Sequence, residues 1–221
     1  YFSLLQREFE LYRQAVDSET KTLIGFDIGG GTPTFASLPA LEGVLEAARR
    51  SFILHDTLAI SIETTPKIAA LEPDKINALY GMGIRRISMG VQTVSERLLQ
   101  AVGRTATSLA YNLQAAENIR QAGFEKFNVD VMYGFAGQSD RAVEATIRHV
   151  IGLAPEYVTL YRMRYKGTSL AFQAQDVSLE QVTRQYALAK ALLREAGYQA
   201  TPGKNTFSRL PGDPGTSDYL T

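Results

Sequence analysis

Cysteine is absent from all 221 residues, so the chain has neither a disulfide scaffold nor a thiolate ligand for a metal. The two histidines, His55 and His149, are too few and too far apart to form a metal site, and both are expected at the surface. No apolar run approaches the length that crosses a bilayer, and no signal-like segment opens the chain. We therefore expect a cytoplasmic protein that has no membrane partner and holds no metal with its own side chains.

An excess of either charge is also lacking. Lys plus Arg and Asp plus Glu both total 23, so nothing in the net charge of zero indicates a nucleic-acid partner. With 45% hydrophobic and 21% charged residues, the chain can bury one core and is expected to form one domain over residues 1–221. It begins with Tyr1 rather than Met, and its last residues read like the start of another element. We expect a fragment of a longer protein in which residues 198–221 begin a C-terminal extension.

Strand-like and helix-like patterns alternate along the chain. Apolar residues between Phe2 and Val16 recur at spacings of three and four, which predicts an amphipathic helix at the start. Strands are predicted at 23–28, 58–63, 86–92, 127–133 and 157–165, and further helices at 38–52, 74–81, 95–102, 108–122, 141–153 and 179–197. The pattern is that of an α/β protein.

This alternation implies parallel strands joined by right-handed crossovers, which a barrel and a doubly wound sheet both satisfy. Polar residues recur at the carboxyl ends of successive strands, and no Rossmann-type glycine fingerprint with a downstream acidic residue is present. Both observations favour a TIM-like barrel. Since the opening helix has no strand before it, a first strand and its loop are expected upstream of Tyr1.

The most informative segment is Asp27 to Thr34, with the sequence DIGGGTPT. Three consecutive glycines remove every β-carbon from a short piece of backbone, so a polar ligand can lie against peptide N–H and C=O groups. Taken alone, a tight turn explains the segment equally well. Glu63 and Gln92 end the next two predicted strands and Asp130 lies within the fourth, so one rim is expected to hold all these residues.

Four ordered motifs carry a family resemblance: GGGTPT at 29–34, SIETTP at 61–66, GIRRISMGVQT at 83–93 and NVDVMYGFAGQ at 128–138. In this order over a βα scaffold they resemble the motif series of radical S-adenosylmethionine enzymes, within the oxygen-independent coproporphyrinogen III oxidase-like branch. The resemblance covers roughly residues 2–197. That branch contains porphyrinogen oxidases, haem-handling proteins and methyl-transferring or ring-forming relatives, so the resemblance leaves the substrate open.

The resemblance implies a partial (β/α)6 barrel and a 4Fe-4S cluster held by a CxxxCxxC loop after the first strand. It also implies an oxidoreductase in which an electron from the cluster cleaves S-adenosylmethionine to a 5′-deoxyadenosyl radical. An external electron donor and a small-molecule substrate, such as a tetrapyrrole, are the implied partners. This sequence lacks those cysteines. Either they lie upstream of Tyr1, as the fragment-like start favours, or the chain is a degenerate relative without redox chemistry.

The resemblance also implies cofactor-binding residues. Gly30, Gly31 and Thr32 match the backbone cradle for the methionyl end of the cofactor. Glu63 matches a cofactor-contacting carboxylate, for which an ammonium group or a ribose diol would be a suitable partner. An ion pair between Glu63 and a neighbouring Lys or Arg, such as Arg86, is the structural alternative.

Three further residues complete the implied set. Gln92 suits a ribose or an adenine edge, although a glutamine at a strand end is also an ordinary loop residue. Arg104 matches the family's cofactor-binding arginine, whose bidentate guanidinium suits the methionyl carboxylate. Asp130 lies among apolar strand residues and is expected to be hydrogen-bonded toward the ribose or the site.

The last predicted strand gives the best indication of the substrate. Alternation places Tyr161, Met163 and Tyr165 on one face and Arg162, Arg164 and Lys166 on the other. If the basic face lines the lumen, Arg162 and Arg164 would hold carboxylates such as porphyrin propionates. Alternatively, only the exposed end of the strand is charged. Three functions stay open: a radical enzyme of this branch, including a methyltransferase; a haem-binding or haem-delivery protein; and an unrelated TIM-barrel enzyme with a phosphate at the glycine loop.

Overall fold

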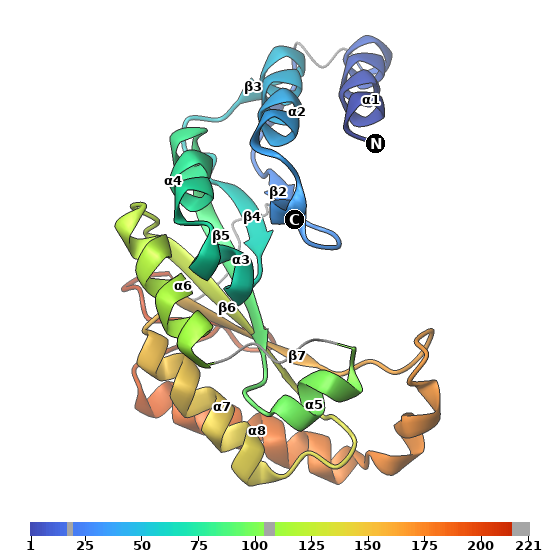
Figure 1. Cartoon of the computed structure of the whole chain (residues 1–221), viewed down its shortest axis with the longest axis vertical. Helices are drawn as coiled ribbons and strands as arrows, with labels where there is room; N and C mark the ends of the chain where they lie inside the picture. The colour runs from blue at the N-terminus through green and yellow to red at the C-terminus, as the bar shows by residue number, and fades with distance from the viewer. Residues whose placement is uncertain (17–19, 104–108, 214–221) are drawn as a thin grey trace.

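The computed structural model describes residues 1–16, 20–103 and 109–213, which form an open arc of strands and helices (Figure 1). Its main feature is a six-stranded sheet in the order β2-β4-β5-β6-β7-β8. The strands up to β7 pair in parallel, and β8 pairs antiparallel with β7. The bounds are β2 (Asp27–Ile28), β4 (Ile60–Thr64), β5 (Ile84–Gln92), β6 (Lys126–Tyr133), β7 (Tyr157–Arg162) and β8 (Thr206–Ser208).

Helices fill the connections between the parallel strands, as parallel pairing requires. They are α1 (Phe2–Ala15), α2 (Leu38–Ser51), α3 (Pro66–Leu71), α4 (Pro73–Gly81), α5 (Glu96–Ala101), α6 (Leu109–Gln121), α7 (Asp140–Leu153) and α8 (Leu179–Glu195), with short 3₁₀ turns at η2 (Pro33–Phe35) and η3 (Ala171–Asp176). The segments that follow β2, β5 and β7 project to the same open side of the arc (Figure 1). The protein is thus an α/β partial barrel, and the fold-class prediction is confirmed.

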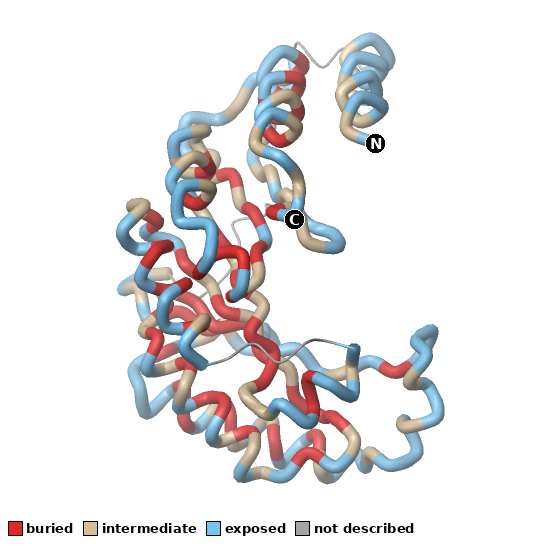
Figure 2. The backbone as a smooth tube through the Cα atoms, in the orientation of Figure 1, coloured by how far each residue is buried: buried red, intermediate tan, exposed pale blue. Residues whose placement is uncertain are grey.

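The core lies between the sheet and the helices that cover its outer face. Alternate residues of the two central strands are at most 2% exposed: Ile87, Met89 and Val91 in β5, and Phe127, Val129 and Val131 in β6. Burying each of these side chains contributes roughly 1.5–3 kcal/mol to folding. The residues between these buried positions, which include Ser88 and Asn128, face the inside of the arc. Buried residues concentrate within the arc, whereas α1 has none (Figure 2).

The first predicted strand, 23–28, is two separate strands. Thr22–Leu23 forms β1, which pairs in parallel with β3 (Ile53–Leu54), whereas Asp27–Ile28 forms β2 and pairs with β4. The prediction of one strand was wrong because apolar periodicity does not reveal a change of partner between neighbouring residues.

Other elements also differ from the sequence prediction. Helix α3 was missed, although Thr65 before Pro66 is an N-cap signal: the Thr65 hydroxyl accepts a hydrogen bond from the Ile68 N–H at 3.3 Å. The last predicted strand stops at Arg162 instead of continuing to residue 165, and Met163 N donates to the Tyr133 carbonyl at 2.8 Å. The alternation of faces therefore ends at Arg162.

The two histidines differ in their surroundings. His55 is exposed as predicted, but His149 on α7 is half-buried, and its Nε2 lies 3.0 Å from the Asn112 amide nitrogen. Burial lowers the pKa of His149 below its ordinary value of 6.5. The surface prediction for His149 was wrong because it lies on a helix face packed against a neighbouring helix. In the described ranges, no helix is long and apolar enough to span a bilayer.

Helices α3 and α6 are joined by a buried amide. The Asn118 side chain, on a residue that is 6% exposed, donates to the Ala69 and Ala70 carbonyls at 2.8 and 3.1 Å and accepts from Gln114. These carbonyls belong to the last turn of α3, where the helix supplies no partner of its own. Asn118 therefore completes the short helix that follows β4.

We predict that Asn118→Ala lowers the free energy of unfolding by about 2 kcal/mol, since two buried carbonyls lose their donor. The measurement is urea unfolding followed by circular dichroism. Gln121→Ala is the control, because the side chain of this exposed residue on the same helix bonds, among the described residues, only to Glu117. Equal stability losses in the two variants would contradict the assigned role of Asn118.

Candidate functional site

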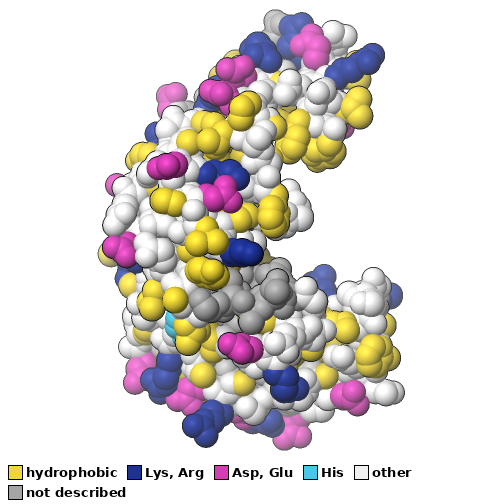
Figure 3. All heavy atoms as spheres, in the orientation of Figure 1, with side chains coloured by type: hydrophobic (Ala, Val, Ile, Leu, Met, Phe, Trp, Pro, Cys, Tyr) yellow, Lys and Arg dark blue, Asp and Glu magenta, His cyan; other side chains and the backbone are white. Residues whose placement is uncertain are grey.

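A hollow of about 890 Å³ opens at the carboxyl ends of the parallel strands. We call it the rim hollow; the space-filling view shows the molecule indented on its open side (Figure 3). It collects most of the residues predicted from the sequence: Gly31, Thr32, Glu63, Gln92, Asp130, Arg162 and Arg164 all line it. Gly30 lines a neighbouring apolar hollow beside η2 instead. Arg104 lies outside the described residues.

The glycine segment after β2 turns sharply. Gly30 and Gly31 have φ angles of +87° and +65°, a region that residues with a side chain rarely adopt, and no atom lies within 4 Å of a β-carbon added at either position. Glycine is required at these two positions by conformation rather than by crowding. Gly29 differs, because an added β-carbon there would lie 3.0 Å from Glu63 Oε1, the end of a flexible side chain that can move aside.

Glu63 presents its carboxylate to the rim hollow from β4. The residue is exposed, and within the described ranges its carboxylate forms no hydrogen bond or ion pair. The structural alternative, an ion pair with a neighbouring Lys or Arg such as Arg86, is absent among the described residues. The carboxylate next to Gly29 is therefore available to a ligand.

Gln92 ends β5 in an unusual backbone conformation. Its φ is +66°, and the Thr93 N–H donates to the Val91 carbonyl at 2.8 Å, which closes a three-residue turn around Gln92. The residue is only 8% exposed yet lines the rim hollow. Its amide makes no hydrogen bond to any residue that the structure describes. This side chain, too, can donate to and accept from a ligand.

Asp130 is held by its neighbours, in contrast to Glu63. The Ser88 hydroxyl donates to Oδ2 at 2.9 Å, and the Asn128 amide donates to Oδ1 at 2.8 Å and to Ser88 Oγ at 2.7 Å. The Thr159 hydroxyl in turn donates to Asn128 Oδ1 at 3.0 Å. Residues from β5, β6 and β7 thus fix the orientation of this carboxylate across the inner face of the sheet.

Tyr161 was not among the predicted site residues, although it lines the rim hollow beside both carboxylates. Burial raises the pKa of its hydroxyl, and the negative charges of Asp130 and Glu63 raise it further. On β7 it is Thr159 and Tyr161, not the basic residues, whose alternation faces inward. Arg162 and Arg164 reach the rim hollow from the end of the strand and from the segment beyond it.

A usable signal existed for the residues that were missed. Ser88 and Asn128 are polar side chains at alternate positions of strands whose other residues are apolar, and such positions face away from the core. Tyr161 lies on the same face of β7 as Thr159, because the two residues are two positions apart. Only the position of the covering helices shows that this face points inward.

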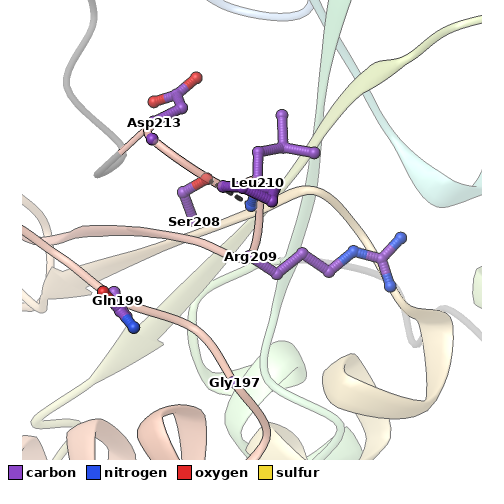
Figure 4. Close-up of a pocket in the computed structure, with 8 residues that line it drawn as sticks. Gly197, Gln199, Ser208, Arg209, Leu210 and Asp213 are labelled. Atoms are coloured by element: carbon purple, nitrogen blue, oxygen red, sulfur yellow. Dashed lines mark hydrogen bonds between the residues drawn. The ribbon is translucent and has the colours of Figure 1, made fainter.

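Another hollow, of about 550 Å³, lies beside β8. The close-up shows the Arg209 side chain extending away from Ser208 and Asp213 (Figure 4). Arg209 forms an ion pair with Glu156 at 2.6 Å, which already neutralises its charge. None of the residues predicted for the site lines this hollow, so the rim hollow is the candidate site.

We predict that the double variant Glu63→Gln/Asp130→Asn lowers the pKa of Tyr161, because two negative charges that disfavour the tyrosinate are removed. The pKa is obtained by ultraviolet titration, as the difference between each protein and the same protein carrying Tyr161→Phe. Glu144→Gln, which changes a surface carboxylate paired with Arg148, should leave it unchanged. An unaltered Tyr161 pKa in the double variant would contradict the arrangement of the three side chains.

Comparison with known proteins finds relatives in both sequence and fold. The chain is 31% identical over 163 residues to the heme chaperone HemW of Lactococcus lactis. This alignment covers 74% of this chain and 41% of the relative. It is 30% identical over 165 residues to the oxygen-independent coproporphyrinogen III oxidase of Synechocystis, covering 75% of this chain and 34% of the relative. The chain thus spans between about a third and a half of the length of these curated relatives.

A solved structure has the same fold. The coproporphyrinogen III oxidase HemN of Escherichia coli superimposes with a TM-score of 0.82 at 23% identity, covering 95% of this chain and 48% of that one. The sequence profile of the radical SAM superfamily matches residues 7–150, a range that includes the rim residues from Gly30 to Asp130. Because this match spans more than half of the chain, the protein belongs to the radical SAM superfamily.

Proposed function

We propose that the rim hollow binds S-adenosylmethionine and that the chain forms the core of a radical enzyme acting on a tetrapyrrole-like substrate. One observation carries the proposal. Glu63, Gln92, Arg162 and Arg164 gather at one hollow, and their polar groups have no side-chain hydrogen bond or ion pair within the described part of the chain. Polar groups turned toward a shared space without protein partners are suited to a polar ligand.

The residues present fit the nucleotide cofactor that this superfamily uses together with a 4Fe-4S cluster. The Glu63 carboxylate matches an ammonium group or a ribose diol, and the Gln92 amide matches a ribose or an adenine edge. Asp130, held by Ser88 and Asn128, presents an oriented acceptor to a ribose hydroxyl. Backbone at Gly31 and Thr32 is open to the methionyl end, and Arg104 is proposed as the partner of the methionyl carboxylate.

The residues present do not fit the 4Fe-4S cluster itself. The chain has no cysteine, and its described residues hold no group of three or more potential metal ligands. The proposal therefore requires cluster ligands from outside these 221 residues. When bound beside such a cluster, S-adenosylmethionine supplies the one-electron chemistry that removes hydrogen from a substrate. The part of this chain is to bind and orient the cofactor; an external electron donor and a cytoplasmic location belong to the proposal as well.

The presence of Arg162 and Arg164 supports the proposal that the substrate carries carboxylates. Both residues line the rim hollow, and neither forms an ion pair in the described residues. A guanidinium binds a carboxylate through two parallel hydrogen bonds. Leu160, Met163 and the ring of Tyr161 add apolar surface next to these charges. A tetrapyrrole with propionate groups combines these two properties.

A haem-binding or haem-delivery role is the second candidate. It is favoured by the 31% identity to a relative named as a heme chaperone, which matches the identity to the oxidase. The same arginines and apolar residues would hold the propionates and ring of a haem. Methyl transfer on the same scaffold has no comparable support among these relatives.

We predict that Glu63→Gln weakens S-adenosylmethionine binding about tenfold, because a charge-assisted hydrogen bond of roughly 1.5–3 kcal/mol becomes a neutral one. Affinity is measured by equilibrium dialysis with labelled cofactor on the full-length protein, with its cluster reconstituted. Glu144→Gln is the matched control, since the same chemical change is made on the surface of α7. Unchanged affinity in Glu63→Gln would remove Glu63 from the site.

The two candidate functions make different predictions for the full-length reconstituted protein. A radical enzyme should release 5′-deoxyadenosine faster when coproporphyrinogen is added, as measured by chromatography. A haem-delivery protein should bind haem in a spectroscopic titration and show no such stimulation. In either case Arg162→Gln/Arg164→Gln should weaken binding of the tetrapyrrole, whereas unaltered binding would exclude these arginines.

A further inference from the structure

The backbone conformation at Gln92 is strained, so contacts with other parts of the protein must hold it in place. Among the described residues other than glycine, only Gln92 and Ala154 have a positive φ. Ala154 ends α7, where a left-handed residue is a common helix terminus. Gln92 is different, because it forms the centre of a three-residue turn with positive φ, a rare and strained conformation. Such strain persists only where the surroundings hold the residue in place.

The sheet provides limited support at this point. The register between β5 and β6 shifts between Gly90 and Gln92, so the regular ladder of backbone hydrogen bonds is interrupted just before the turn. The residues that follow Gln92 are instead tied to a helix. Thr93 is 1% exposed, and its hydroxyl oxygen lies 3.3 Å from that of Thr146 on α7, which is equally buried.

The donors and acceptors in this link can be assigned from the full set of contacts. The Thr146 hydroxyl donates to the Ala142 carbonyl at 2.8 Å, so its single proton is used within α7. It must therefore accept from the Thr93 hydroxyl, and it also accepts from Val94 N–H at 3.2 Å. The Thr93 oxygen in turn accepts from Ser95 N–H at 3.2 Å. One hydroxyl on α7 thus holds two successive residues immediately after Gln92.

We propose that Thr146 is a positioning residue for the cofactor, acting through Gln92. By holding residues 93 and 94 against α7, its hydroxyl maintains the left-handed turn that presents the Gln92 amide to the rim hollow. Thr146 itself does not line that hollow. This inference rests on the proposed binding of S-adenosylmethionine, and it adds a determinant of affinity that lies on a covering helix.

The test compares three substitutions in the full-length reconstituted protein by equilibrium dialysis with labelled S-adenosylmethionine. Thr146→Val keeps the shape but removes the hydroxyl, and it should weaken binding about tenfold. Thr146→Ser keeps the hydroxyl and should bind within about twofold of wild type. Thr183→Val is the matched control, because the Thr183 hydroxyl also donates to a helix carbonyl, that of Leu179, but on the exposed surface of α8. It should bind like wild type.

A double-variant cycle separates positioning from general destabilisation. Gln92→Ala retains the β-carbon, and hence the strain, but removes the amide. If Thr146 acts through Gln92, Thr146→Val should cause no further loss of affinity in the Gln92→Ala background. A further tenfold loss there would overturn the inference, since it would mean that Thr146 affects binding by another route. Should Thr146→Val fail to fold, Thr93→Val breaks the same link from the other side and should give the same pattern.

The outcomes also distinguish this inference from the function on which it rests. Wild-type protein that does not bind S-adenosylmethionine would overturn the proposed function and the inference together. Binding by wild type that is weakened by Gln92→Ala but unchanged by Thr146→Val would overturn the inference alone. Weaker binding in Thr146→Val, rescue by Thr146→Ser and no added effect in the Gln92→Ala background would support it.

Discussion

The structure depends on the burial of one face of its central parallel strands. In β5 and β6 every second side chain packs against the covering helices, and this packing determines which residues remain on the inner face. Ser88, Asn128 and Asp130 are on that face because Ile87, Met89, Phe127 and Val129 are on the other. A one-residue change of register would reverse both sets, so the same apolar contacts that stabilise the sheet also orient the site.

Much of this arrangement could be predicted from the sequence. The alternation of strands and helices indicated parallel pairing, and the carboxyl ends of parallel strands meet at one rim. That reasoning placed Glu63, Gln92 and Asp130 together without coordinates, and the structure has all three at one hollow. The motif order then identified the superfamily, which the sequence profile over residues 7–150 confirms.

What escaped prediction depends on contacts between distant residues. The split of the first strand follows from β1 pairing with β3 while β2 pairs with β4, and β8 joins the sheet in the opposite direction to β7. No local pattern in the sequence indicates either pairing. The same holds for the hydroxyl link from Thr93 to Thr146, whose partners are separated by 53 positions. Tyr161 was missed because alternation defines two faces of a strand but not which one the helices cover.

The two carboxylates of the site differ in how freely they move. Asp130 is locked by Ser88 and Asn128, so a ligand that meets it needs no rearrangement of the protein. Glu63 has no such restraint among the described residues, and ordering its side chain costs roughly 1–2 kcal/mol of rotational entropy. Ligands of somewhat different shape can therefore be accommodated at the Glu63 end, whereas the Asp130 end tolerates little variation. With S-adenosylmethionine bound as proposed, selectivity among related nucleotides would be concentrated at the Asp130 end.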